Sequence, residues 1–337
     1  MSTTSLPSVS DFVIVVSESK RIINSHARHF LVLSVLFLLP LSFSLAVFPT
    51  LLTTLSSNHP NRIETHFRST SFPKSHDHHK ISTKFLTLCL LFPVFTLVLC
   101  LSAVGSITYS VFHGFYGGPV KLIAAIKSLS SSFIPLLVTM IAAQLIVFVV
   151  VGLFGLFWYL GIKGIDLIGV QISYDSPYCV AFSLTVALVL GFVLMYLNVN
   201  WALVGVIVVL ESKWAFKAMA RSSSLIRGMR KVRLTLVMFF WVSAVLLLWM
   251  LMVSGKDSDV VDAEWKSWAF IVQIVGTSAI LTLLLLHNTA ANTVLYMYCK
   301  ALHGELVGEI AEEFATAYAS LSFDDDKTPP PVSVVAH

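Results

Sequence analysis

Basic side chains gather in one stretch of the chain, Glu211–Arg233, which lies between two apolar runs. On a helix, Lys213, Lys217 and Arg221 would form one cationic stripe, because they recur every four residues. A basic residue close to an anionic leaflet contributes about 1 kcal/mol to the attraction of headgroups. The stretch could therefore bind anionic lipid headgroups, or its cations could only set the topology and reach phosphates non-specifically. The candidate contacts are Lys213, Lys217, Arg221, Arg227, Arg230, Lys231 and Arg233.

A second set of polar side chains lies inside the last apolar run and comprises His287, Asn288 and Asn292. Asn288 and Asn292 are four residues apart, so they share one helical face. Polar groups inside a membrane need partners, and they either join helices by hydrogen bonds or line a pathway. We interpret the three as intramembrane polar contacts, with helix–helix hydrogen bonding as the simpler role.

Histidines are concentrated in the first polar loop, as SHDHHK at 75–80 together with His66. Imidazole suits zinc or copper, but no cysteine and no fixed ligand spacing accompanies these residues. We therefore expect a solvated loop and no metal site. The chain also lacks a phosphate-binding loop, a Gly-x-Ser-x-Gly elbow and a His-Glu-x-x-His motif. No enzyme, no catalytic residue and no cofactor is predicted.

Composition decides the class of protein. Of the 337 residues, 56% are hydrophobic and only 12% are charged, and the mean hydropathy is +0.84. Soluble domains carry about 25% charged residues, so lipid must cover much of this surface. Long apolar runs indicate helices rather than barrel strands, which alternate in polarity over about 10 residues. The predicted fold class is all-α, a polytopic membrane protein with six transmembrane helices.

The six expected spans follow from the apolar runs, and they contain no Asp, Glu, Lys or Arg in their cores. The fourth run, 32 residues long, would reach about 48 Å against a bilayer core of about 30 Å. We expect one tilted helix there that passes the cytoplasmic boundary, and a break near Asn198–Asn200 is the alternative. The expected spans cover about 30–55, 85–109, 133–160, 179–210, 234–253 and 268–299, within a membrane domain at 30–302.

Shorter segments flank the spans. Residues 1–29 contain an expected interfacial helix, Asp11–His29, and a second one is expected at Val120–Leu129. The third is the basic helix that follows Glu211. After the last span, 303–322 has the pattern of an acidic amphipathic helix, and 323–337 that of a disordered tail.

The distribution of Lys and Arg predicts the orientation. The N-terminus, second loop, fourth loop and C-terminus together carry 14 of these residues, and the opposite loops carry 8. The positive-inside rule therefore places both termini in the cytosol. The first loop, with five basic residues, argues against this orientation, and the fourth, with seven in a short segment, argues for it more strongly.

An internal repeat fits the same topology. Val13–Lys20 reads VIVVSESK and Val206–Lys213 reads VIVVLESK, so that seven of eight positions match. A shift of 193 residues places the first two spans over the fifth and sixth. The segment before the third span could be a weaker third copy. The alternative is chance similarity between two apolar octamers.

The sequence ESKWAFKAMARSSSLIRGMR at Glu211–Arg230 resembles a known pattern. It is similar to the six-span membrane domain associated with glycerophosphodiester phosphodiesterases in some bacteria. In that family a helix with an Ala-x-x-Arg-Ser core and a later glycine precedes the fifth span, and the matching positions here are Ala218, Arg221, Ser222 and Gly228. The whole chain also resembles uncharacterised plant multi-pass membrane proteins. The resemblance implies a membrane location without catalysis, because the phosphodiesterase domain is separate.

Together these features predict a non-enzymatic membrane-organising, lipid-contacting or trafficking-associated protein of the plasma membrane or an endomembrane. Its expected partner is the bilayer, with anionic headgroups on the cytosolic face, and no nucleic acid. The alternative function is a facilitator or channel for a small solute. The lack of charge in the expected spans argues against an ion-coupled transporter, which usually carries charged residues near the midplane.

Overall fold

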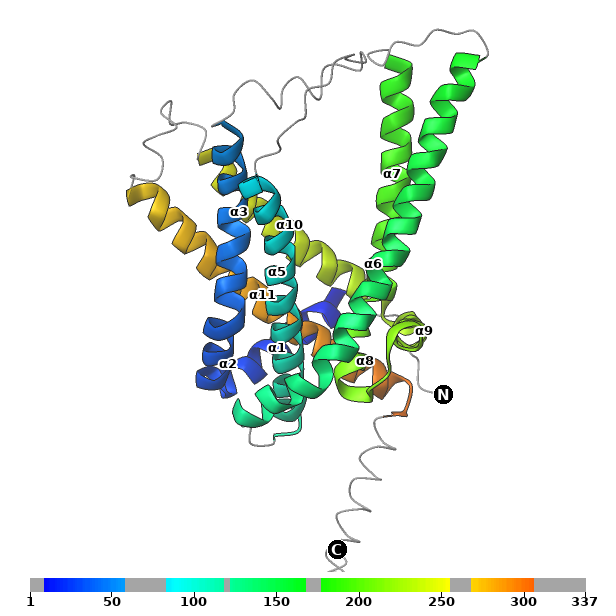
Figure 1. The fold of residues 1–337 in the computed structure, drawn as a ribbon. Coiled ribbons are helices and arrows are strands. Elements are labelled where there is room, and N and C mark those ends of the chain that lie inside the picture. Colours follow the sequence, from blue (N-terminus) through cyan, green and yellow to red (C-terminus); the bar gives the residue numbers. More distant parts are fainter. Residues whose placement is uncertain (1–8, 58–82, 118–121, 168–176, 255–267, 306–337) are drawn as a thin grey trace, which may run out of the picture.

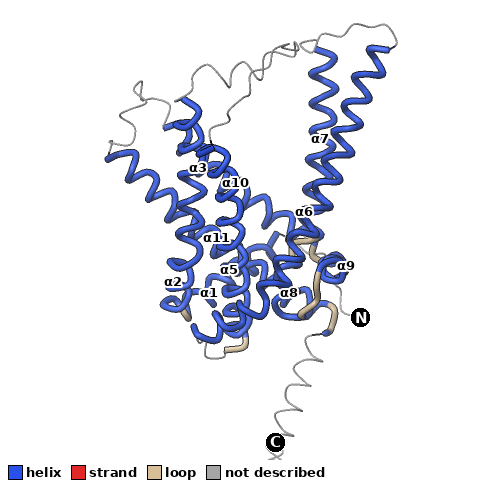
Figure 2. Tube along the Cα trace, in the orientation of Figure 1, coloured by secondary structure: helices blue, strands red, loops and turns tan. Residues whose placement is uncertain are grey.

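The computed structural model describes residues 9–57, 83–117, 122–167, 177–254 and 268–305, and these contain helices but no strand. Figure 2 shows this all-helical trace. Six helices are long and apolar enough to cross a membrane. The elements are α1 (Val9–Ser25), α2 (Ala27–Leu33), η1 (Ser34–Leu38), α3 (Leu39–Ser57), α5 (Thr83–Phe115), α6 (Leu122–Leu167), α7 (Pro177–Asn200), α8 (Val204–Glu211), α9 (Ala215–Leu225), η2 (Ile226–Gly228), α10 (Arg230–Ser254) and α11 (Trp268–Leu302).

The helices form three regions, which can be followed in Figure 1. The central bundle consists of α3, α5 and α11, which pack on one another. The base consists of the short helices α1, α2, α8 and α9. The outer hairpin consists of α6 and α7, whose far ends rise away from the central bundle. Helix α10 packs on α11, α1 and α7 and so joins the regions.

The base is more deeply packed than helices lying flat on a membrane would be. In α1, Val15, Ile22 and Ile23 are buried against the main apolar core. Helix α1 packs on α10 and α11, whereas α8 packs on α5 and α6. Helices α1 and α8 therefore each cover a pair of helices that is distant from them in the sequence.

The first expected span contains an irregular segment just before Pro40. Residues Ser34–Leu38 form a π-helix, in which the Leu39 N–H donates to the Ser34 carbonyl. Proline lacks an N–H, and its ring crowds the carbonyl four residues earlier. The wider turn relieves this crowding while the chain continues as helix through Pro49.

The segment expected as a short helix, Val120–Leu129, is helical from Leu122 but does not form an element of its own. Leu122–Leu167 is one helix of 46 residues, so the amphipathic segment continues directly into the third span. Pro135 lies inside this helix, and the Thr139 hydroxyl donates to the Pro135 carbonyl at 2.7 Å. The N-terminal part packs on α5, and a Cβ added at Gly105 would lie 2.9 Å from Leu129.

The preferred single helix for the fourth span is wrong, and the alternative break is observed. Helix α7 ends at Asn200, and α8 begins at Val204 after a turn. The helix of the fifth span, α10, begins at Arg230, four residues before the expected start at Leu234. The span therefore contains basic residues, among them Arg233. The histidine-rich loop, the tail at 323–337 and all but the first residues of the expected acidic helix lie outside the described residues.

The two copies of the repeated octamer differ in conformation. The first lies entirely within α1. The second ends its helix at Glu211, and Ser212 adopts a left-handed conformation with φ of 51°. The two copies therefore share a helical start, but the last two residues of the second copy lie outside its helix.

Candidate functional site

The motif in α9 connects three parts of the molecule. Ala218 is fully buried against the core. The Ser222 hydroxyl donates to the Asn200 carbonyl at 2.7 Å and accepts the Leu203 N–H at 3.3 Å. It thereby satisfies two backbone groups that the break between α7 and α8 leaves without helical partners. Ser222 is thus a structural clamp for this break.

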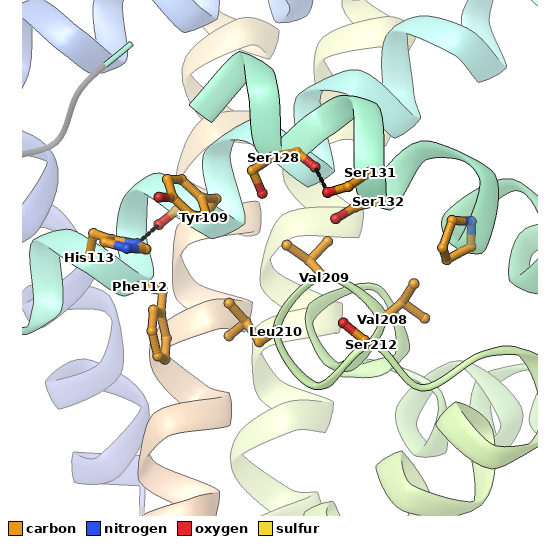
Figure 3. Close-up of a pocket in the computed structure, with 11 residues that line it drawn as sticks. Tyr109, Phe112, His113, Ser128, Ser131, Ser132, Val208, Val209, Leu210 and Ser212 are labelled. Carbon is orange, nitrogen blue, oxygen red and sulfur yellow. Dashed lines mark hydrogen bonds between the residues drawn. The ribbon is translucent and has the colours of Figure 1, made fainter. Parts of the chain in front are cut away.

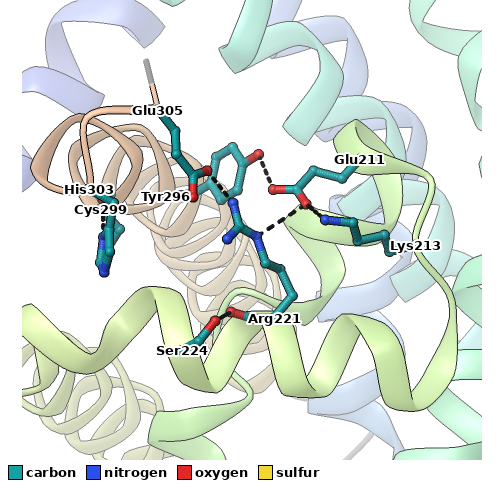
Figure 4. Close-up of polar contacts among 8 residues, drawn as sticks. All are labelled: Glu211, Lys213, Arg221, Ser224, Tyr296, Cys299, His303 and Glu305. Carbon is teal, nitrogen blue, oxygen red and sulfur yellow. Dashed lines mark hydrogen bonds and ion pairs between the residues drawn. The ribbon is translucent and has the colours of Figure 1, made fainter. Parts of the chain in front are cut away.

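Arg221 links the base to the end of α11, as Figure 4 shows. Its Nε lies 3.4 Å from Glu211 Oε2, and its Nη2 donates to Glu305. The Tyr296 hydroxyl donates to Glu211 Oε1 at 2.9 Å, and Lys213 Nζ lies 2.7 Å from Glu211 Oε2. Gly228, just after α9, also lies against the end of α11, because a Cβ added there would be 2.6 Å from Leu302.

The contact between Arg221 and Glu305 shifts the pKa of both side chains. The hydrogen bond from Arg221 holds the pKa of Glu305 below its ordinary value. The same bond raises the pKa of Arg221. Both groups therefore carry charge at neutral pH. The arrangement is a salt-bridge network that fixes α9 against α11, and it leaves Arg221 poorly placed to hold an external ligand.

The start of α9 is fixed from a neighbouring helix. The Ala215 N–H donates to the Thr139 hydroxyl of α6 at 2.9 Å. Thr139 is almost fully buried and substitutes for the side-chain cap that Trp214 does not provide. The Ala215 φ of 47° lies in the left-handed region, which is uncommon outside glycine.

A hollow of about 280 Å³ opens on the base between α5, α6 and α8. Figure 3 shows its lining of aromatic rings, apolar side chains and hydroxyls, including Tyr109, His113, Ser131 and Leu210. The hydroxyl of Ser131 and the ring Nδ1 of His113 bond to backbone carbonyls of their own helices. No acidic or strongly basic side chain lines it, so it offers little for recognising a charged ligand.

A larger cavity of about 500 Å³ lies where the central bundle, the outer hairpin and α10 meet. Its walls are mainly apolar. The polar lining comes from different helices, with Thr108 on α5, Asn198 on α7 and Arg233 on α10. Asn288 and Asn292 on α11 complete this set. An apolar cavity with a few converging polar groups is the usual form of a small-ligand site.

A second cavity of about 330 Å³ adjoins the first and runs along α10 and α11. The two cavities share Asn198, Arg233 and Asn288 in their walls. Arg233 is only 7% exposed, and its Nη1 donates to Asn292 Oδ1. Its Nε is buried and has no hydrogen-bond partner among the described residues.

The structure distributes the seven candidate lipid contacts over three environments. Lys213 and Arg221 pair with carboxylates. Arg230 is half-buried, and Arg233 lies inside the protein. Lys217, Arg227 and Lys231 are exposed. The expected cationic stripe is therefore divided. Lys213 is also exposed but pairs with Glu211, so the three exposed cations without an ion pair among the described residues are the members open to headgroups.

The intramembrane candidates also separate. Asn288 and Asn292 line the cavity, as their shared helical face predicts. His287 does not line it, and its Nδ1 bonds to the Leu283 carbonyl of the same helix. Sequence reasoning missed Asn198 as a site residue, although it interrupts an apolar run. It also placed Arg233 on the membrane surface, because the start of α10 was set four residues too late.

No group of three or more His, Cys, Asp or Glu in the described ranges could hold a metal ion. Among the same residues, the four cysteines are unpaired and stand apart as Cys89, Cys100, Cys179 and Cys299. His66 and the SHDHHK segment, where the metal hypothesis was considered, lie outside the described residues.

Six apolar helices of spanning length, packed without any strand in the described ranges, define a multi-pass membrane protein. Residues 8–319 match the model of one family, described as "Domain of unknown function (DUF8558)". The match covers most of the chain, so the chain belongs to that family. No curated protein and no solved structure matches it significantly. The resemblance to the domain associated with bacterial phosphodiesterases stays a prediction.

Proposed function

We propose that this protein is a non-enzymatic, lipid-contacting membrane protein that organises membrane or takes part in trafficking. The observation that carries the proposal is the corner formed by α9 and the start of α10. There Lys217, Arg227 and Lys231 are exposed, and none makes an ion pair within the described residues. Trp214 and Phe216, both more than half exposed, lie beside Lys217. Aromatic and basic residues together are typical of the membrane interface.

The proposed partner is a leaflet rich in anionic headgroups. The chain would be purified in a mild detergent from membranes of mixed anionic and zwitterionic lipid, and the bound phospholipids counted by mass spectrometry. Replacing Lys217, Arg227 and Lys231 by Gln should reduce the anionic fraction, because each cation contributes about 1 kcal/mol to headgroup attraction. A matched control replaces three other exposed cations, Lys20, Arg28 and Lys127. An equal loss in both proteins would leave only a non-specific charge effect and contradict the proposal.

The proposed orientation places both termini and the α9 corner in the cytosol, at the plasma membrane or an endomembrane. A single cysteine at Ser223, in a chain without its four native cysteines, tests this with an impermeant maleimide. Labelling should require permeabilised cells, or opened vesicles for a protein of internal membranes. Labelling of intact cells would reverse the topology and remove the cytosolic leaflet as the partner.

A facilitator for a small solute is the second candidate, and the cavity near Arg233 favours it. Polar groups of α5, α7, α10 and α11 line that cavity. From the sequence, such polar residues were clear only on the sixth span. Reconstituted liposomes would be tested for uptake of small neutral and anionic solutes. Uptake above that of empty liposomes, and lowered by Asn288→Leu, would favour transport over the lipid-contacting function.

A further inference from the structure

Arg233 is a buried cation without a counter-ion. It is 7% exposed, and no carboxylate of the described residues forms an ion pair with it. Its hydrogen-bond partner, Asn292, is a neutral amide. Placing an arginine inside a membrane is costly, so such residues usually have a partner that compensates the charge. The described chain supplies one hydrogen bond, and the charge itself is uncompensated.

The groups around Arg233 are arranged to accept an anion. Nε has no partner among the described residues, and the side-chain amides of Asn198 and Asn288 belong to the same cavity walls. All three line both cavities. A guanidinium offers donors in a planar fork that matches a carboxylate or a phosphate, and amide N–H groups can donate to the remaining oxygens. The head of the expected ligand is therefore a carboxylate or phosphate.

The second cavity accounts for the rest of the ligand. Beyond the shared polar residues, its lining is apolar from Val237 to Leu248 on α10, a length of about 16 Å along the helix. Trp241 and Val245 line it and are both exposed, so the cavity is open along its side. This form suits an acyl chain better than it suits a water-soluble anion.

We infer that the adjoining cavities hold one anionic amphiphile, with its carboxylate or phosphate head on Arg233 and its acyl chain between α10 and α11. The inference rests on the lipid-contacting function and names a specific site for it. This site is separate from the three exposed cations of the α9 corner. The ligand enters from the bilayer, because the chain end of the site opens laterally.

Equilibrium binding of radiolabelled dodecyl phosphate tests the site, with the full chain purified in an uncharged detergent. Saturable binding near one per chain is expected. Unlabelled dodecanoate should compete, whereas inorganic phosphate and dodecyl phosphocholine should compete poorly. Equal competition by inorganic phosphate would show a free-anion site and overturn the inference, as would equal competition by the zwitterionic amphiphile.

Three variants locate the ligand. Arg233→Gln removes the charge, and Asn292→Asp supplies an internal counter-ion, so each should weaken binding by at least about tenfold. Ala244→Phe fills the apolar cavity and should also weaken binding. Arg230→Gln is the matched control, since Arg230 lies one turn earlier and lines neither cavity. Gel filtration checks that each variant is folded.

Asn292→Asp separates a ligand site from a purely structural contact. An ion pair with Arg233 should preserve or raise the melting temperature while binding is lost. Unchanged binding in this variant would overturn the inference. The Gln variant of Lys217, Arg227 and Lys231 should bind dodecyl phosphate normally in detergent, so failure of the headgroup proposal and failure of this site are distinguishable.

Discussion

Helix α5 of the central bundle and helix α6 of the outer hairpin are similarly apolar, but the two regions are packed very differently. The mean hydropathy of the most apolar window is 2.5 in α5 and 2.7 in α6. In the bundle, Ala290 and Ala291 of α11 are fully buried, and the Ser42 and Thr282 hydroxyls lie 2.6 Å apart between α3 and α11. In the hairpin, a Cβ added at Gly152 would meet no atom within 4 Å.

The difference shows that hydropathy places a helix in the membrane but does not choose its neighbours. Helices associate in lipid where small residues allow close approach and where polar groups hydrogen bond across the interface. Helix α11 combines both features. The exposed halves of α6 and α7 are lined instead by large side chains such as Phe148, Phe157 and Phe192. These surfaces are left to lipid or to partners.

The largest expected effect comes from enlarging a small residue in the central bundle. Ala290→Leu should lower the free energy of unfolding by about 1–3 kcal/mol, because the closely packed site cannot accept the extra volume. The measurement is thermal unfolding in detergent. Gly152→Leu is the matched change in the hairpin and should leave the melting temperature unchanged or slightly higher. Similar losses in both would show that the two regions do not differ in packing.

The joint between the hairpin and the base should be the next most sensitive point. Ser222→Ala leaves the Asn200 carbonyl and the Leu203 N–H without their side-chain partner, at a cost of about 1–3 kcal/mol. Ser223→Ala is the control, because the Ser223 hydroxyl bonds only to the Ala220 carbonyl of its own helix and is exposed. The unfolding midpoints of the two variants should differ clearly. Equal midpoints would remove the clamp role of Ser222.

A smaller effect is expected when one interhelical hydrogen bond is removed from each region. Thr282→Val removes the bond to Ser42, and Trp158→Phe removes the bond from Nε1 to the Ser183 hydroxyl, which is 2.8 Å long. Such bonds contribute about 0.6 kcal/mol on average in membrane proteins. Only the Thr282 variant should lower the global melting temperature, since the hairpin can loosen without opening the bundle. A larger decrease for Trp158→Phe would reverse this order.

The smallest effect is the pH dependence of the contact between Arg221 and Glu305. The pKa of Glu305 is lowered on folding, so its ion pair stabilises the folded state fully above the ordinary pKa of 4.5. This stabilisation is lost as the pH falls through the lower pKa of the folded state. Glu305→Gln should flatten the decline of the melting temperature below that pH. Because Glu305 is partly exposed, we expect a modest change. If the melting temperature fell with pH equally in the native protein and in Glu305→Gln, the contact would not contribute to the pH dependence of stability.

Composition and run length were sufficient to predict the class, the all-α fold and the six spans. The errors occurred where local pattern competes with tertiary contacts. A short helix at Val120–Leu129 was expected ahead of the third span, but the contact of α6 with α5 and the Thr139 hydroxyl support one continuous helix. The apolar run of the fourth span gave no sign of the clamp by Ser222, which comes from a later helix.

The candidate site was predictable in part. Helical spacing placed Asn288 and Asn292 on one face, and both line the cavity. The role of Arg233 was not predictable, because a basic cluster before a span is normally a surface feature. Burial depends on how α10 packs against α11, and the sequence carries no short-range signal for that packing.

The position of α1 has a consequence for biosynthesis. Its buried residues Val15, Ile22 and Ile23 belong to a helix that packs on α10 and α11, which emerge from the ribosome after the other described helices. During synthesis the apolar face of α1 must be kept elsewhere, at the membrane surface or on a chaperone. The base can close around α1 only after α11 has been inserted.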